Sequence, residues 1–219
     1  RAINGSKSTF ADVEFGKINS DSFTLKNCYV SRIGDNQLID EDICPSVTID
    51  NLHVDNTAAG KRRNLIAFFK IGLYNKNADI TVKNSSFIND ANTIYPLLQY
   101  QGFRNNPEIL IDDSYDINLN FTDNVVYNTG AVEAGVFYLA SGQLSSLKIT
   151  GNTFVSTDKS RNFMKDIEDW SSSENCQLAG NITISENSFV GFDANTLLCD
   201  LNMGNNNPKL TNCFVSSDS

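Results

Sequence analysis

Apolar and polar residues alternate in short segments along most of the chain, a pattern typical of β-strands. Seven segments share one template, in which an alternating strand is followed by an asparagine and then by an aromatic and a β-branched residue. They are FTLKNCYV, VTIDNLHV, ITVKNSSFI, INLNFTDNVVY, LKITGNTFV, ITISENSFV and KLTNCFV. Repetition of one short template predicts a solenoid, in which similar strands stack along an axis.

A second apolar element of strand length lies between these templates. Its segments span residues 36–41, 64–70, 93–100, 135–140, 161–167 and 196–201. Each repeat is therefore expected to contain three short strands. Asn-Gly and Asp-Gly dipeptides, which favour tight antiparallel hairpins, are nearly absent. The chain is predicted to be an all-β, single-stranded parallel β-helix of about seven coils.

The template asparagines are predicted to occupy a sharp bend between stacked strands. Asparagine tolerates the left-handed backbone region well, and its amide can bond the equivalent amide of the next coil. The predicted ladder contains Asn27, Asn51, Asn84, Asn124, Asn152, Asn187 and Asn212. The aromatic position of each template is expected to stack inside the coil. It holds Tyr29, His53, Phe87, Tyr127, Phe154, Phe189 and Phe214, with the histidine read as a substitute for a core aromatic residue.

This template resembles the asparagine-ladder turn of right-handed parallel β-helices in the pectate-lyase-like superfamily. The segments ITVKNSSFIND, ITGNTFVS and KSRNFMKDI look like β-helix domains of secreted and surface proteins of Bacteroidetes, many of them uncharacterised. The resemblance covers about residues 10–215. It implies one right-handed β-helix domain over 1–219, within a longer protein that is extracellular or attached to the cell surface. It also implies association with polysaccharide.

Charge and composition exclude several other classes. The net charge of −9 argues against nucleic acid or an anionic membrane surface as the partner. No apolar run is long enough for a membrane span. A single histidine excludes two-histidine metal sites and argues against a Ser-His-Asp hydrolase.

The five cysteines include no C-x-x-C pair, so a zinc or thioredoxin-type site is not expected. We expect buried thiols rather than a disulfide framework, because a chain of this length builds its core without cross-links. The cysteines are Cys28, Cys44, Cys176, Cys199 and Cys213.

Basic and aromatic residues around the second apolar element are the candidate ligand-binding residues. Arg63 and Arg161 each stand before an Asn-apolar-apolar segment, so we expect them on one face. A uronate lyase needs a base, usually Lys or Arg, and a cation beside the substrate carboxylate, whereas binding needs only charge and a stacking ring. The candidates are Arg63, Lys70, Tyr100, Arg104, Arg161, Lys165 and Trp170.

No cofactor is predicted, although calcium could bind one of three acidic sets. These are Asp40, Glu41 and Asp42; Asp112, Asp113 and Asp116; and Asp166, Glu168 and Asp169. The first and last are expected about four coils apart, too far to share an ion.

Three functions fit these observations. The first is a non-catalytic glycan-binding or scaffold module, because no complete catalytic signature is present. The second is a uronate lyase that uses Arg or Lys chemistry, with or without calcium. The third is a structural segment of a tailspike or adhesin.

Overall fold

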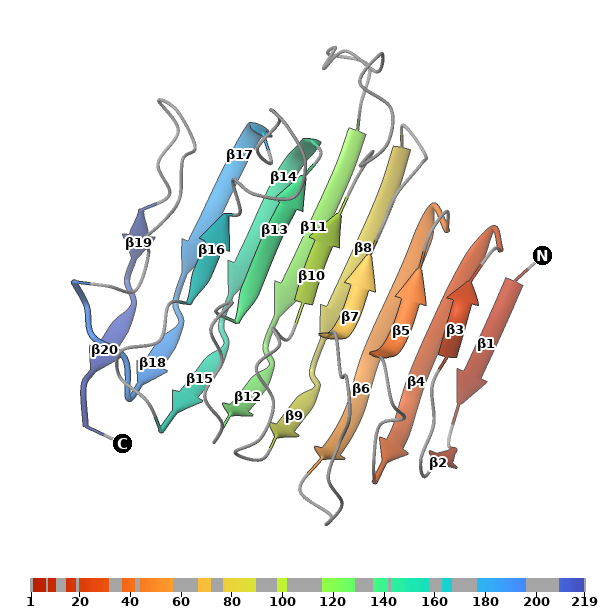
Figure 1. Ribbon diagram of the computed structural model, residues 1–219, viewed down its shortest axis with the longest axis horizontal. Coiled ribbons are helices and arrows are strands. Elements are labelled where there is room, and N and C mark those ends of the chain that lie inside the picture. Colours follow the sequence, from red (N-terminus) through yellow and green to blue (C-terminus); the bar gives the residue numbers. More distant parts are fainter. Residues whose placement is uncertain are drawn as a thin grey trace.

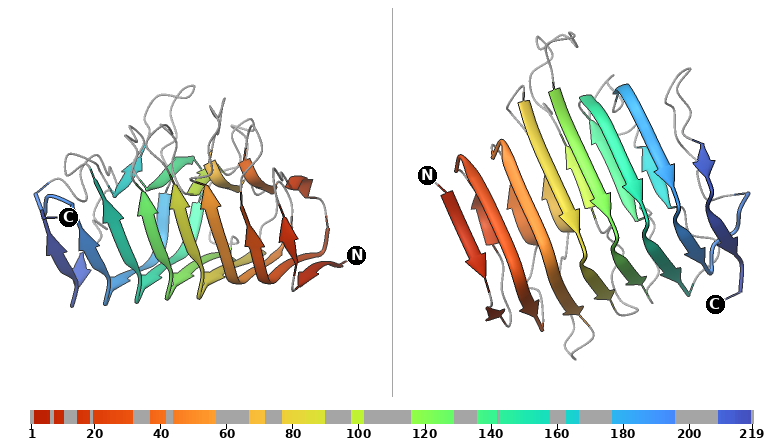
Figure 2. Two further views of the ribbon diagram at one scale, coloured as in Figure 1. Left: turned by 90° about the horizontal axis from the view of Figure 1, so that it is seen from below. Right: turned by 180° about the vertical axis from the view of Figure 1, so that it is seen from behind.

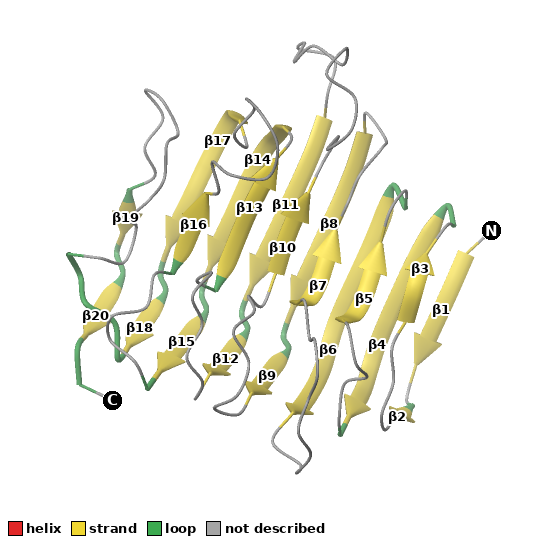
Figure 3. Ribbon diagram, in the orientation of Figure 1, coloured by secondary structure: helices red, strands yellow, loops and turns green. Residues whose placement is uncertain are grey.

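The computed structural model describes residues 2–6, 8–10, 15–18, 20–31, 37–41, 44–56, 67–71, 77–89, 98–101, 116–128, 136–141, 143–157, 163–166, 177–195 and 209–218. All regular secondary structure in these ranges is β-strand (Figure 3). The fold class predicted from the sequence is therefore confirmed at the level of an all-β, solenoid-like chain.

The strands form two parallel sheets (Figure 1). The larger sheet contains β1 (Ala2–Ser6), β2 (Thr9–Phe10), β4 (Ser22–Val30), β6 (Ser46–Asn56), β8 (Asn77–Lys83), β9 (Ser86–Asn89), β11 (Asp116–Thr122), β12 (Val125–Asn128), β14 (Gln143–Thr150), β15 (Thr153–Ser156), β17 (Gln177–Ser185), β18 (Ser188–Val190), β19 (Leu210–Thr211) and β20 (Phe214–Ser216). The smaller sheet contains β3 (Phe15–Ile18), β5 (Gln37–Glu41), β7 (Ala67–Ile71), β10 (Leu98–Gln101), β13 (Phe137–Ser141) and β16 (Met164–Asp166). Equivalent strands from successive repeats thus lie side by side in each sheet.

Both predicted elements are found in these sheets. Five of the six second apolar segments overlap β5, β7, β10, β13 and β16, and the sixth, 196–201, lies outside the described residues. The asparagine templates form the larger sheet. No helix long and apolar enough to cross a membrane occurs in the described ranges.

The larger sheet has two arms that meet at a bend (Figure 2). The first arm contains β8, β11, β14, β17 and β19, and the second contains β9, β12, β15, β18 and β20. Strands β4 and β6 run through the bend and belong to both arms. At the bend each chain segment places one residue in the left-handed region, with φ from 52° to 71°. These bend residues are Asn27, Asn51, Asn84, Asp123, Gly151, Glu186 and Asn212.

The prediction that all seven template asparagines form one row is wrong. Asn124, Asn152 and Asn187, in the middle of the molecule, are shifted by one residue. Thr122 pairs with Lys83 and Thr150, so Asp123 is the residue in register with Asn84. The template asparagines of these later repeats therefore lie one position after the bend. They form an inner-corner row, which contains Cys28, Leu52, Ser85, Asn124, Asn152, Asn187 and Cys213.

The core lies between the two sheets and contains aromatic rings in two places. Phe10, Phe15 and Phe23 pack together in the first repeats, and a larger cluster lies in the later ones. Phe154 stacks on Phe121 and Phe189, with ring centroids 6.1 and 5.3 Å apart. From the smaller sheet and the residue before it, Phe137 and Phe163 pack against the same rings. The predicted inward positions of Phe87, Phe154 and Phe189 are confirmed, because all three are buried.

Four other predicted core residues are wrong, because they point to solvent. The exposed residues are Tyr29, His53, Tyr127 and Phe214. Successive residues of a strand face opposite sides, so a shift of one position reverses the direction of a side chain. The inward positions are held instead by the adjacent valines, Val30, Val54, Val126 and Val215.

The prediction of buried thiols is confirmed for Cys28 and Cys44. Cys28 and Cys44 are buried thiols, and Cys213 is a half-buried thiol. Cys176 and Cys199 lie outside the described residues.

Candidate binding surfaces

The smaller sheet places two predicted ligand-binding residues in one row across its strands. Lys70 of β7 and Lys165 of β16 occupy the same row, linked through Gln99 and Tyr138. Three strand spacings separate them, or about 14 Å. Tyr100 lies in the next row, opposite Ile71. Arg63, Arg104, Arg161 and Trp170 lie outside the described residues.

The first and last acidic sets are separated by the number of strands that the sequence predicts. Asp40 and Glu41 lie in β5 and Asp166 in β16, four strand spacings apart, or about 19 Å. This separation is too large for one ion. Asp116 begins β11, and the other acidic candidates lie outside the described residues. Within the described ranges, no group of three His, Cys, Asp or Glu side chains has the geometry of a metal site.

Behind the bend, buried asparagine side chains hydrogen-bond in series. Asn124 Nδ2 donates to Asn152 Oδ1 at 3.1 Å, and Asn152 Nδ2 donates to Asn187 Oδ1 at 2.9 Å. Each acceptor oxygen also receives a backbone N–H from the preceding repeat, as Asn152 Oδ1 does from Asn124 at 2.8 Å. The same amide groups donate to backbone carbonyls, including that of Phe121. These side chains therefore satisfy backbone groups that the bend removes from the sheet ladder.

Earlier repeats use different residues at this inner corner. Ser85 Oγ accepts the Leu52 N–H at 3.0 Å and donates to the Lys83 carbonyl at 2.7 Å. Cys28 donates weakly to the Lys26 carbonyl. A hydroxyl or thiol thus replaces the amide in the first part of the molecule.

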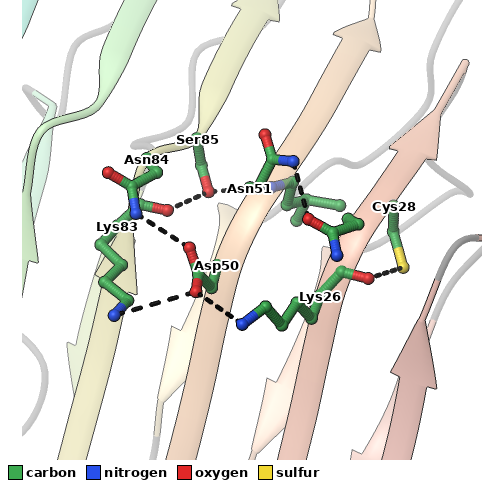
Figure 4. Close-up of polar contacts among 9 residues, drawn as sticks. Lys26, Cys28, Asp50, Asn51, Lys83, Asn84 and Ser85 are labelled. Atoms are coloured by element: carbon green, nitrogen blue, oxygen red, sulfur yellow. Dashed lines mark hydrogen bonds and ion pairs between the residues drawn. The ribbon is translucent and has the colours of Figure 1, made fainter.

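On the outer side of the bend, the early repeats carry a charged network (Figure 4). Asp50 Oδ2 lies 3.5 Å from Lys26 Nζ and 3.8 Å from Lys83 Nζ, while its Oδ1 accepts a hydrogen bond from Asn84 Nδ2 at 2.9 Å. The Asn84 bond, followed by the charges of Lys83 and Lys26, holds the pKa of Asp50 below its ordinary value, against the opposing effect of burial. The side chain of Asp50 is only 14% exposed, whereas Lys26 is 55% exposed.

The only histidine lies beside this network. His53 Nε2 is 2.9 Å from Asn51 Oδ1, and His53 Nδ1 is 2.8 Å from Ser86 Oγ. Asn51 in turn donates to Asn27 Oδ1 at 2.8 Å. We refer to the residues of both networks as the bend ridge; they are Lys26, Asn27, Asp50, Asn51, His53, Lys83, Asn84 and Ser86.

Next to the ridge, the solvent side of the second arm exposes apolar and aromatic side chains. Tyr29 is 42% exposed and pairs with His53 on the neighbouring strand. One row of this face is continuous in register across four strands. It contains Ile88, Tyr127, Val155 and Val190. Val125 and Phe214 are also exposed on this second-arm face.

The solvent side of the first arm is different, because it is uniformly polar. One row across its strands contains Thr24, Thr48, Thr81, Asn120, Lys148 and Thr183. The neighbouring row continues from Lys83 through Thr122 and Thr150 to Ser185. We refer to this surface as the first-arm face.

Sequence reasoning missed the second-arm face, since it placed Tyr29 and Tyr127 in the core. The strand alternation contains the signal: in CYV and VVY the aromatic residue is adjacent to a valine, and only one of the two can point inward. No family model, curated protein or solved structure matches the chain.

Proposed function

We propose that the chain is a polysaccharide-binding module that acts outside the cell or at its surface and holds the glycan without cleaving its backbone. Its architecture would be a pectate-lyase-like parallel β-helix of about seven coils, with an asparagine ladder in its later part. Parallel pairing of every successive strand supports this architecture, and crossovers between parallel strands are almost always right-handed. The serial bonds from Asn124 to Asn187 support the ladder.

The observation that carries the binding proposal is the exposed apolar surface beside a polar ridge. A pyranose ring presents C–H groups on its faces and hydroxyl groups around its edge. Tyr29 and Tyr127 offer flat apolar contacts, while Asn51, His53 and Lys83 offer donors and acceptors a short distance away. Aromatic side chains that stay exposed in the folded chain are typical of a recognition surface.

The dimensions of the second-arm face favour a linear ligand over a protein partner. From β4 to β20 it spans six strand spacings, about 29 Å, and four strand residues give a width of about 13 Å. The area is roughly 400 Å², whereas a stable protein interface buries about 800 Å² on each side. A glycan chain lying along the strand-stacking direction fits this narrow strip.

The test is binding of polysaccharides by the double variant Tyr29→Ala, Tyr127→Ala. Affinity electrophoresis in gels with pectin, alginate, xylan or mannan first identifies a retarding glycan. We expect the variant to bind that glycan at least about tenfold more weakly, because both stacking surfaces are lost. The matched control, Thr81→Ala with Lys148→Ala, alters the first-arm face and should retain wild-type affinity.

Two outcomes would redirect the proposal. Undiminished binding by the tyrosine variant, with loss in Arg63→Ala, Arg161→Ala, would move the site to the basic residues predicted from the sequence. Release of unsaturated products that absorb ultraviolet light would establish a uronate lyase, and its dependence on added calcium would test the acidic sets.

A further inference from the structure

Three side chains of the bend ridge form a hydrogen-bonded series with the order nucleophile, base and orienting group. Ser86 Oγ lies 2.8 Å from His53 Nδ1, and His53 Nε2 lies 2.9 Å from Asn51 Oδ1. His53 and Ser86 are register partners on adjacent strands, so the rigid sheet holds this geometry. Nucleophile and base within hydrogen-bond reach, with the base held by a third group, is the arrangement of an activated serine.

The hydrogen bonds also fix the tautomer of the imidazole. Asn51 Nδ2 donates to Asn27 Oδ1, so its Oδ1 is the atom turned toward His53 and can only accept. His53 Nε2 therefore carries the proton, and Nδ1 presents a lone pair to the Ser86 hydroxyl. This is the tautomer in which Nδ1 can accept the Ser86 proton.

We propose that Ser86 is a nucleophile for acyl esters, with His53 as general base and Asn51 as a positioning residue. Ser86 Oγ bonds to the ester carbonyl carbon while its proton moves to His53 Nδ1. The bond from that carbon to the alkoxy oxygen breaks, and the alcohol leaves with the proton from His53. Water then cleaves the acyl-serine, giving up its proton through His53 and restoring Ser86, and the net products are a carboxylic acid and an alcohol.

This activity is separate from the proposed glycan binding. It can be tested on small esters, without a glycan. His53 is exposed and Ser86 half-buried, so esters carried on small or polymeric alcohols both have access. The same exposure lets water compete for the imidazole. We therefore expect slow turnover of activated esters, with general-base assistance worth about a hundredfold.

The experiment measures covalent labelling by a fluorophosphonate probe and hydrolysis of p-nitrophenyl acetate. In labelling, a phosphorus–oxygen bond forms at Ser86, fluoride leaves, and the serine proton passes to His53. Peptide mass spectrometry should locate the label on Ser86. Ser86→Ala should abolish both signals, and His53→Gln should slow labelling about a hundredfold.

Matched variants separate the proposed roles from structural effects. Ser188 occupies the same register position on β18 without a neighbouring histidine, so Ser188→Ala should leave labelling unchanged. Both Asn51→Gly and Asn51→Asp tolerate the left-handed backbone, but only aspartate keeps an acceptor for Nε2. Asn51→Asp should retain labelling, whereas Asn51→Gly should slow it about tenfold at unchanged stability.

Labelling that is equal in wild type and His53→Gln would overturn the proposal. So would hydrolysis that survives in Ser86→Ala but not in His53→Gln, because the imidazole itself would then be the nucleophile. Neither result would affect binding at Tyr29 and Tyr127, so failure here is distinguishable from failure of the proposed binding function.

Discussion

The early and late repeats of the larger sheet form the same bend with different residues. In the early repeats, β4 to β9, asparagine occupies the bend position and a cysteine, leucine or serine the inner corner. In β11 to β18 the asparagine is at the inner corner and an aspartate, glycine or glutamate is at the bend. One residue type thus serves two purposes, tolerating positive φ in the early repeats and satisfying buried backbone groups in the late ones.

The core changes along the same direction. Behind the bend, the equivalent row holds Val30, Val54 and Phe87 in the early repeats and Val126, Phe154 and Phe189 in the late ones, so aromatic rings are more frequent in the late part. The late repeats combine stacked aromatic rings with a serial amide network. We therefore expect the late half of the molecule to be more sensitive to substitution of its interior.

The largest expected difference is in the core. Phe154→Ala should lower the free energy of unfolding by about 3–5 kcal/mol, because it removes a buried ring that packs on Phe121, Phe163 and Phe189. The early counterpart Val54→Ala should cost less, since a smaller side chain is removed. Urea denaturation of the two variants measures this difference, and equal costs would contradict the contrast in the core.

An effect of similar size is expected from the inner-corner amides. Asn152→Ala leaves the Asn124 N–H and the Phe121 carbonyl without the partners that Asn152 provides, and each such buried group costs about 1–3 kcal/mol. The control is Asn27→Gly, an exposed bend position where glycine adopts φ 55° without strain. The control should change stability by less than about 0.5 kcal/mol. A control as destabilised as Asn152→Ala would mean that both rows have the same role.

The sequence predicts most of the architecture because strands and bends depend on local patterns. Alternation defines the strands, and recurrence of the template defines their stacking. The sequence does not show which residue occupies the bend, since asparagine is suited both to the bend position and to the inner corner that follows it. The residue before the asparagine does not separate the two cases. Aspartate precedes it in both Asp50-Asn51 and Asp123-Asn124, yet the left-handed residue is Asn51 in the first and Asp123 in the second.

The candidate site was less predictable, because it depends on contacts between strands distant in sequence. His53 and Ser86 are far apart along the chain, and only the register of β6 with β9 brings them together. The inward or outward direction of Tyr29 depends on which residue of its own segment occupies the bend, because a shift of one position reverses the direction of a side chain. The shared row of Lys70 and Lys165 was not predicted either, because they stand at different distances after Arg63 and Arg161 in the sequence.

Backbone strain at the bend gives a third prediction. Gly151 has φ 71°, and an added Cβ would meet Asp123 Oδ1, so Gly151→Ala should destabilise by about 1–2 kcal/mol. Glu186, at φ 58°, is a residue that rarely adopts this region, so Glu186→Gly should stabilise slightly, by less than about 1 kcal/mol. Thermal and urea unfolding measure both changes. A loss of stability in Glu186→Gly would show that its side chain contributes more than its backbone costs.

The smallest expected effect concerns acid, and it should belong to the early repeats alone. Asp50 shares its row with Lys26 and Lys83, whereas the late repeats place Thr122, Thr150 and Ser185 there. Because folding lowers the pKa of Asp50, its contribution is complete above about pH 4, the unfolded pKa, and is lost as pH falls through the lower folded pKa. Partly exposed ion pairs contribute little, so the loss should stay below about 1 kcal/mol.

The measurement is urea unfolding of the wild type and Asp50→Asn at pH 6 and at pH 3. We expect the variant to be less stable at pH 6 and the difference to shrink at pH 3, where the wild-type carboxylate begins to take up a proton. High salt should reduce the difference at pH 6 only in part, since it screens Lys26 and Lys83 but leaves the Asn84 hydrogen bond. A difference that is the same at both pH values would exclude charge at Asp50 as its source and would leave the early and late repeats equally sensitive to acid.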